Sequence, residues 1–188
     1  MHKDQKRDIV FMSDPSLSRK AQPVDAITDE VKDLAKDMLD MMYAARGCGL
    51  AAPQVGEQIR LIVVDVDWDP NNKKKKRNPY VLINPEIVEL SDETHASSEG
   101  CLSFPGVTTE VMRANKIVVE AEALDGDRYA YSAEQSLLCD CLQHEIDHLN
   151  GITLIDHMSV AERAVAKKTV QDKIAQAHNQ GKTPWEVD

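Results

Sequence analysis

Residues 143–148 read Q-H-E-I-D-H, and this short stretch decides how the rest of the chain is interpreted. On a helix, His144 and His148 are four residues apart, so both imidazoles project from the same face about one turn from each other. Two such nitrogens can bind one divalent metal ion, and Glu145 stands beside them, able to reach a metal-bound water. The stretch therefore predicts a metal-binding helix. Most catalytic metals also need a third protein ligand, which has to come from elsewhere in the chain.

The sequence around this stretch predicts a buried helix. Apolar residues surround the histidines at Leu137, Leu138, Cys141, Leu142 and Leu149. Ser132 opens S-A-E-Q, a capping-box pattern that predicts the helix start, and Asn150 with Gly151 predicts its end. Two histidines and a glutamate in such a helix are costly unless they have partners or a function.

The remaining elements predict an α+β fold. The stretch 28–47 has apolar residues at helical spacing, with Thr28 as a candidate N-cap and Gly47 as a terminator. Strands are predicted at 60–67, 80–84, 116–124 and 128–132, the last two joined by Asp125 and Gly126, a hairpin signal. A last helix is predicted at about 159–178. We therefore expect antiparallel strands packed around a central helix carrying HEIDH, with an N-terminal and a C-terminal helix.

Length and composition restrict the class of protein. With 188 residues, 42% of them hydrophobic, the chain is expected to form one catalytic domain over 1–188. A net charge of −10 argues against a general DNA binder, and the sequence has neither a signal peptide core nor a membrane-spanning run. A cytoplasmic, reducing location is expected, so the four cysteines are not assigned to disulfides. The basic run Lys73 to Arg77 is interpreted as a solvated loop, with a localisation or nucleic-acid signal as the alternative.

Three sources can be considered for the third metal ligand. A third histidine at metzincin spacing is absent, because Leu154 occupies that position. A glutamate from a second helix would have to be Glu162, whose register nothing ties to the first helix. Among the cysteines, Cys48 and Cys101 both lie in glycine-bearing loops, and Cys101 is favoured because Gly100 permits a close approach of the backbone.

Three motifs stand in a fixed order along the chain: G-C-G-L-A-A-P-Q at 47–54, E-G-C-L-S at 99–103 and Q-H-E-I-D-H at 143–148. Together they resemble the signature motifs of the peptide deformylases, and the resemblance covers most of the chain. It implies hydrolytic removal of the formyl group from N-formylmethionine at the start of new polypeptides. The implied metal ligands are Cys101, His144 and His148, with Glu145 as the group that accepts and returns the proton.

The same resemblance assigns the binding roles. The side-chain amide of Gln54 and the backbone N–H of Leu102 are implied as donors to the formyl oxygen. The substrate backbone is expected to pair like an added strand with the main chain of Cys48, Gly49 and Gly100. Leu137 and Cys141, which share a helical face, are expected at the methionine pocket. Asp140 and Cys48 depart from the family pattern, which leaves open the preference for residues after methionine.

The resemblance also implies a cofactor and partners. Fe(II) is the implied metal, with nickel, cobalt or zinc as substitutes, and N-formylmethionyl peptides are the implied substrates. The basic residues of the last helix suggest docking on the ribosome near its exit, and a helix that only covers the core is the alternative. Asp147 is expected either to orient a histidine or to face solvent. A peptidase and a module with a structural metal are the other functional hypotheses, the first weakened by Cys101 and the second by having only three ligands.

Overall fold

The computed structural model describes residues 7–72 and 74–187. In these residues the helices are α1 (Asp29–Ala44), α2 (Leu137–Leu149) and α3 (Val160–Gln180), and 3-10 turns cover η1 (Pro15–Ser18), η2 (Ala52–Val55) and η3 (Leu154–His157). The strands are β1 (Gly49–Ala51), β2 (Leu61–Val64), β3 (Tyr80–Leu90), β4 (Thr94–Gly100), β5 (Thr108–Ala114), β6 (Lys116–Glu122) and β7 (Arg128–Glu134).

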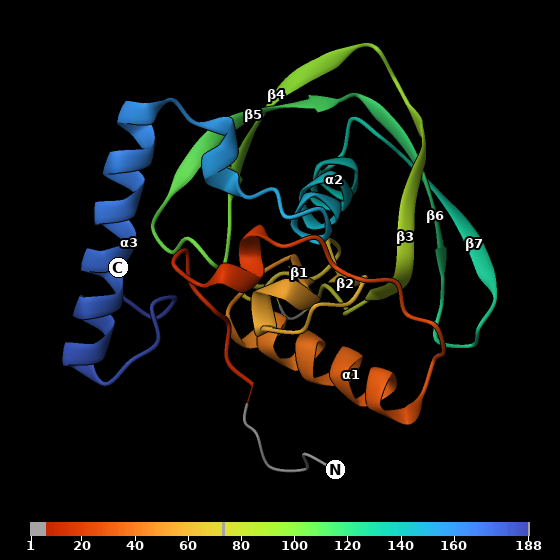
Figure 1. The fold of residues 1–188 in the computed structure, drawn as a ribbon, viewed down its shortest axis with the longest axis horizontal. Coiled ribbons are helices and arrows are strands. Elements are labelled where there is room, and N and C mark those ends of the chain that lie inside the picture. Colours follow the sequence, from red (N-terminus) through yellow and green to blue (C-terminus); the bar gives the residue numbers. More distant parts are fainter. Residues whose placement is uncertain (1–6, 73, 188) are drawn as a thin grey trace.

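The strands form two antiparallel sheets that surround α2 (Figure 1). The larger sheet has the order β1-β2-β3-β6-β7, and β4 pairs with β5 in a separate ribbon. The predicted hairpin is confirmed, because Glu122 pairs with Arg128 and Gly126 adopts a φ of 89° in the turn. The α+β class and the central position of the HEIDH helix are therefore also confirmed.

Strand β2 is buried on both faces, which explains its continuous apolar sequence L-I-V-V. Leu61 and Val63 belong to the hydrophobic cluster that includes Leu34 and Met38 of α1. Ile62 and Val64 belong to the cluster on the other side, with the α2 residues Leu142, Ile146 and Leu149. Helix α2 is thus fixed by its apolar face, and each fully buried aliphatic side chain contributes about 1.5–3 kcal/mol.

The start of α2 differs from the prediction. Ser132 and Glu134 lie in β7, where they pair with Val118 and Lys116 of β6, so the S-A-E-Q pattern is not a helix cap. The helix begins at Leu137, and the side chain of Ser136 accepts the Cys139 N–H as its N-cap. Strand pairing therefore overrides the local capping signal, whereas the predicted end at Asn150 and Gly151 is confirmed, with Gly151 at a φ of 75°.

The end of α1 also differs from the prediction. The helix stops at Ala44, and the residue in the left-handed region is Arg46 at a φ of 60°, not Gly47. The Gly47 N–H still closes the helix by donating to the Met42 carbonyl at 2.9 Å. Gly47 is needed for another reason, because a Cβ at this position would lie 2.7 Å from Cδ1 of Leu102.

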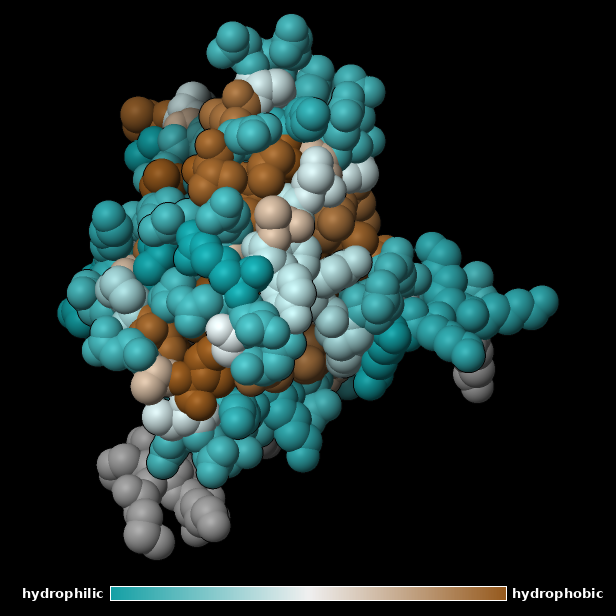
Figure 2. Space-filling model, turned by 90° about the vertical axis from the view of Figure 1, so that its right-hand side faces the viewer, coloured by the Kyte–Doolittle hydropathy of each residue, from teal (hydrophilic) through white to brown (hydrophobic). Residues whose placement is uncertain are grey.

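Helix α3 packs at the side of the molecule against the β4–β5 ribbon and its loop (Figure 1). Two of its three buried residues, Ala166 and Val170, join a cluster with Phe104 and Leu154, and most of its surface is exposed. Figure 2 shows the β6–β7 side, where hydrophobic residues form patches between hydrophilic ones. None of the described helices is long and apolar enough to cross a membrane.

The structure describes the predicted basic run except for its first residue. Lys73 lies outside the described residues, while positions 74 to 77 are exposed between β2 and β3, in agreement with a solvated loop. The Arg77 guanidinium lies 3.8 Å from the ring centroid of Tyr43, which ties the end of this loop to α1.

Candidate active site

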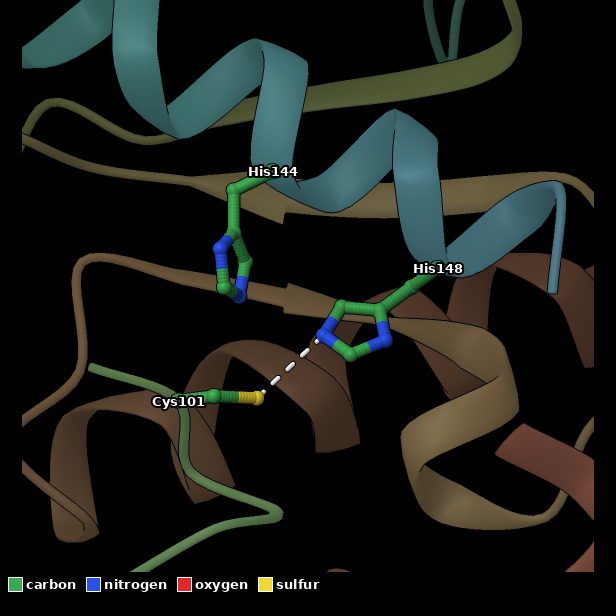
Figure 3. Close-up of side chains that lie close together, drawn as sticks. All are labelled: Cys101, His144 and His148. Atoms are coloured by element: carbon green, nitrogen blue, oxygen red, sulfur yellow. Dashed lines mark hydrogen bonds between the residues drawn. The ribbon is translucent and has the colours of Figure 1, made fainter. Parts of the chain in front are cut away.

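Cys101, His144 and His148 converge at one point (Figure 3). Each offers one ligand atom, and these atoms all lie within 4.8 Å of one another. The Cys101 Sγ lies 3.2 Å from His148 Nε2. The two histidines come from successive turns of α2, and Cys101 follows directly after β4. Among the sources considered for a third ligand, the fold thus brings Cys101 to the histidines.

The donor set fits a divalent transition metal. A thiolate and two imidazoles are ligands that zinc, iron, nickel and cobalt all accept. Burial holds the pKa of His148 well below its usual range, so its ring is in the neutral form that binds metals. Burial also acts to lower the pKa of His144, but its hydrogen bonds with Cys101 and Glu99 outweigh this and raise it. Metal binding at His144 would therefore release a proton.

Glu145 is buried beside this cluster, and its side chain lines a cleft in the surface. Its carboxylate oxygen Oε2 has no hydrogen-bond partner within the described part of the chain. Burial raises the pKa of Glu145 to about 8, which is the expected effect of removing a carboxylate from water. A buried, unpartnered carboxylate next to three metal ligands is suited to binding a metal-bound water.

Gly49 makes the close approach of Glu145 to β1 sterically feasible. A Cβ at this position would collide with Oε1 of Glu145 and would lie 2.7 Å from the Sγ of Cys141. The glycine of the first motif therefore lets β1 lie directly against the face of α2 that carries Cys141 and Glu145.

Gln54 points its amide into the same site. Its Oε1 accepts the Ala51 N–H at 2.8 Å, which fixes the orientation of the side chain. Its Nε2 lies 3.4 Å from Cys101 Sγ and 3.2 Å from Ser103 Oγ. Gln54 is 1% exposed, so this donor is held beside the metal ligands by packing as well as by hydrogen bonds.

A buried charge network binds the Nδ1 atom of His144. The Glu99 Oε2 lies 2.8 Å from His144 Nδ1 and 2.9 Å from Nη2 of Arg113, while Nε of Arg113 donates to the other Glu99 oxygen at 2.7 Å. Burial alone would raise the pKa of Glu99, but its bonds with His144 and Arg113 lower it to about 2. A carboxylate on Nδ1 leaves Nε2 of His144 free for the metal.

Within the described part of the chain, the Asp147 carboxylate makes no hydrogen bond or ion pair with His144 or His148. Its carboxylate accepts from Arg113 Nη1 at 2.6 Å and lies 3.5 Å from Nε2 of His157. Of the two alternatives expected for Asp147, the structure shows neither a hydrogen bond to a metal-ligand histidine nor a fully solvated side chain, and Glu99 is the carboxylate bound to His144. Glu99 stands in the second motif, but no local pattern indicates Arg113, which lies on β5.

The remaining predicted residues line one cleft of about 600 Å³. Its lining includes Cys48, Gly49, Gly100, Leu102, Leu137 and Cys141. The cleft lies between β1, at the edge of the large sheet, and β4, at the edge of the ribbon. Leu137 is 57% exposed, so it forms the rim of the cleft and not part of the buried core expected from the sequence.

Asp140 adds a polar group to the wall of this cleft. Its Oδ2 accepts from Ser97 Oγ at 2.9 Å, and its Oδ1 lies 3.2 Å from His95 Nε2. His95 is only partly exposed, and its Nδ1 lies 2.9 Å from Asn115 Oδ1, so hydrogen bonds on both ring nitrogens fix its side chain beside Asp140. The departure from the family pattern at Asp140 therefore affects the cleft directly.

Comparisons with known proteins agree with this site. The family model of polypeptide deformylase matches residues 6–164. A peptide deformylase from Bartonella quintana is 41% identical over 174 residues, which is 90% of this chain and 96% of the relative, and one from Dictyoglomus thermophilum is 48% identical over 150 residues, or 80% of this chain and 91% of the relative.

Solved structures show the same relationship. The crystal structure of a peptide deformylase from Legionella pneumophila has a TM-score of 0.82 and 40% identity, and covers 91% of this chain and 97% of that chain. The enzyme from Synechococcus elongatus in complex with actinonin has a TM-score of 0.77 and 35% identity, over 91% of this chain and 89% of that chain. With its fold, its Cys-His-His cluster and its sequence all matched, this chain belongs to the polypeptide deformylase family.

Proposed function

We propose that this chain, as one catalytic domain over 1–188, hydrolyses the formyl amide of N-formylmethionyl peptides with one divalent metal held by Cys101, His144 and His148. The observation that carries this assignment is the convergence of the three ligand atoms within 4.8 Å, with the unpartnered Glu145 oxygen beside them. A closed structural site would use four protein ligands, whereas three leave one position for water.

The metal, when bound, supplies a water of lowered pKa and polarises the formyl carbonyl. Glu145 takes the proton from the attacking water and returns it to the departing amine nitrogen. Its side chain can do so because it lines the cleft next to His144. A nearby cation favours its carboxylate form and so opposes the effect of burial on its pKa. Glu99 keeps the His144 ring in the orientation and tautomer that leave Nε2 free.

Gln54 and Leu102 are proposed to stabilise the charge that develops on the formyl oxygen. Gln54 Nε2 is fixed beside Cys101, and the peptide N–H of Leu102 belongs to the residue that follows this ligand. Donors that are already in place need no reorganisation as the charge forms, and losing one typically costs about 3 kcal/mol of transition-state stabilisation.

The peptide is proposed to bind as an extended strand between β1 and β4. Both are edge strands, and the main chain of Cys48, Gly49 and Gly100 lines the cleft between them. Leu137 and Cys141 of α2 are proposed to contact the methionine side chain, since both line the cleft. Cys141 lies about one turn before His144, and Leu137 lies about two turns before it.

Formate release from formyl-Met-Ala, with and without a chelator, tests this function directly. We expect hydrolysis that the chelator abolishes and that added metal restores. Cleavage of internal peptide bonds in unformylated substrates, without formate release, would instead support the peptidase hypothesis and contradict the proposal.

For the native metal we propose Fe(II), with nickel or cobalt as active substitutes and zinc as a weaker one. Ligand type alone favours zinc over ferrous iron in affinity, so the choice rests on the family. Iron beside a thiolate is sensitive to oxygen, and protein purified in air is expected to lose activity as Cys101 is oxidised. Equal and stable activity of the zinc form in air would contradict the iron assignment.

We further propose that the enzyme works in the cytoplasm on chains that are still emerging, and that α3 docks near the ribosomal exit. Lys167 and Lys168 lie on the exposed surface of α3 in an otherwise acidic protein. Reversing both charges to Glu in the full chain should reduce co-sedimentation with ribosomes at low salt. Unchanged co-sedimentation would leave α3 with only a structural role.

A further inference from the structure

The active-site cleft is lined by both tryptophans of the chain. Trp68 follows β2, and Trp185 lies in the segment after α3, yet both line the same cleft together with Arg46, Pro70 and Pro105. Both indole rings are half-buried. Trp68 and Trp185 are far apart in sequence, and they line one cleft because the fold brings both of their segments to it.

Each indole N–H is bound to the backbone on a different wall of the cleft. Trp68 Nε1 donates to the Gly47 carbonyl at 3.1 Å, directly before β1. Trp185 Nε1 donates to the Leu102 carbonyl at 3.3 Å, one residue after the metal ligand Cys101. Since the polar atom of each ring is already satisfied, the surface that each ring presents to the cleft is apolar.

Each indole ring packs against one other aromatic side chain. Tyr43 packs edge-on against Trp68 with centroids 4.9 Å apart, and Phe11 lies 5.9 Å from Trp185. Both side chains also line the cleft. Rings fixed in this way lose little conformational entropy when a ligand binds.

Trp185 belongs to a segment that the family model does not cover, because the match ends at residue 164. After α3 the chain turns back toward the body of the molecule (Figure 1). Gly181 ends the helix at a φ of 62°, and the Glu186 carboxylate accepts from both the backbone N–H and the hydroxyl of Thr183 at 2.8 Å. Val187 is 8% exposed, so the segment is anchored on both sides of Trp185.

We infer that Trp68 and Trp185 form a binding subsite for an apolar, preferentially aromatic, side chain that follows the formylated methionine in the peptide. The inference rests on the proposed function, because it places the formylated end of the peptide at the metal cluster. The lining of the cleft between β1 and β4 includes a polar pair, Asp140 and Ser97, and these two rings. The polar pair does not suit an aromatic side chain, and the two indoles do.

The tryptophans themselves report occupancy, since the chain has only these two. In a Glu145→Gln background loaded with nickel, formyl-Met-Phe-Phe should change the intrinsic fluorescence in a saturable manner, and formyl-Met-Gly-Gly should do so only weakly. The change should shrink in Trp68→Phe and again in Trp185→Phe. Saturable binding of both peptides with no difference in fluorescence would overturn the subsite.

Kinetics then separate a subsite from a structural role. Trp185→Leu and Trp68→Leu should raise the KM for formyl-Met-Phe-Phe by about twofold to tenfold, with little change in kcat and little effect on formyl-Met-Gly-Gly. Trp→Phe should restore much of the loss, because the ring is kept. Tyr129→Leu, which removes an exposed aromatic residue on β7, is the matched control and should leave both constants unchanged.

Two results would contradict the subsite. In Leu variants with normal metal content and thermal stability, an unchanged ratio of KM values for the two peptides would remove both rings from substrate recognition. A fall in kcat alone, equal for both peptides, would assign the tryptophans to the structure of the Gly47 and Leu102 segments. Failure of the proposed function would look different, because the unmodified enzyme would then release no formate from either peptide.

Discussion

Replacing Arg113 by methionine tests whether the buried charge network stabilises the fold. Arg113 and Glu99 are 6% and 7% exposed at their side chains, and the guanidinium binds both oxygens of the Glu99 carboxylate. Arg113→Met removes the guanidinium and leaves the buried carboxylate with His144 as its remaining partner. Breaking a buried pair in this way costs about 3–5 kcal/mol. In a chain of this size each kcal/mol lowers Tm by about 2–4 °C, so we expect a fall of about 6–20 °C.

The pH dependence of stability gives an independent magnitude. The pKa of Glu99 is about 2 in the folded protein against an ordinary 4.5, a difference worth about 3 kcal/mol. Because the folded pKa is the lower one, this contribution is fully present above pH 4.5 and is lost as the pH falls toward 2. Urea unfolding of metal-free protein across this range should show the loss, and Arg113→Met should show much less of it.

Two further variants separate the effect of the buried pair from that of losing an arginine. Arg128→Met removes an arginine that is 46% exposed and paired with Glu120, and it should cost no more than about 1 kcal/mol. The double variant Arg113→Met with Glu99→Met replaces the buried pair by apolar side chains and should recover much of the stability at neutral pH. A cost below about 1 kcal/mol for Arg113→Met alone would show that the guanidinium contributes little to the stability of the fold.

Three shorter predictions concern the site itself. Glu145→Gln should keep one metal per chain by elemental analysis while formate release falls by about a hundredfold or more, because the amide cannot take a proton; normal turnover would exclude Glu145 as the base. Cys101→Ser should lower metal affinity sharply in a competition titration, since a hydroxyl is a poor substitute for thiolate, and tight stoichiometric binding would reopen the choice of third ligand. Gly49→Ala should destabilise the protein by about 1–3 kcal/mol in urea, because the new Cβ meets Cys141 and Glu145, whereas Gly100→Ala has ordinary contacts at 3.6 Å and should be nearly neutral in stability.

Local patterns predicted the elements whose signals do not depend on the rest of the fold. The i, i+4 spacing of His144 and His148 is sufficient to put both rings on one face of α2, and the Asp125–Gly126 turn is sufficient to define a hairpin. The prediction failed at Ser132, where two local signals competed. A capping box and a strand both suited that serine, and only pairing with β6, which lies earlier in the chain, decides between them.

The parts of the site that the sequence could not predict are those set by tertiary contacts. Arg113 meets Glu99 because β5 pairs with β4, and it meets Asp147 because α2 lies beneath that ribbon, so three charges with no common motif become one network. Trp185 reaches Leu102 only through the turn after Gly181. In both cases the contact forms behind a metal ligand or beside it: the network holds His144, and the indole holds the carbonyl next to Cys101. The motifs thus specify the reacting groups, while residues outside them determine how rigidly these groups are held.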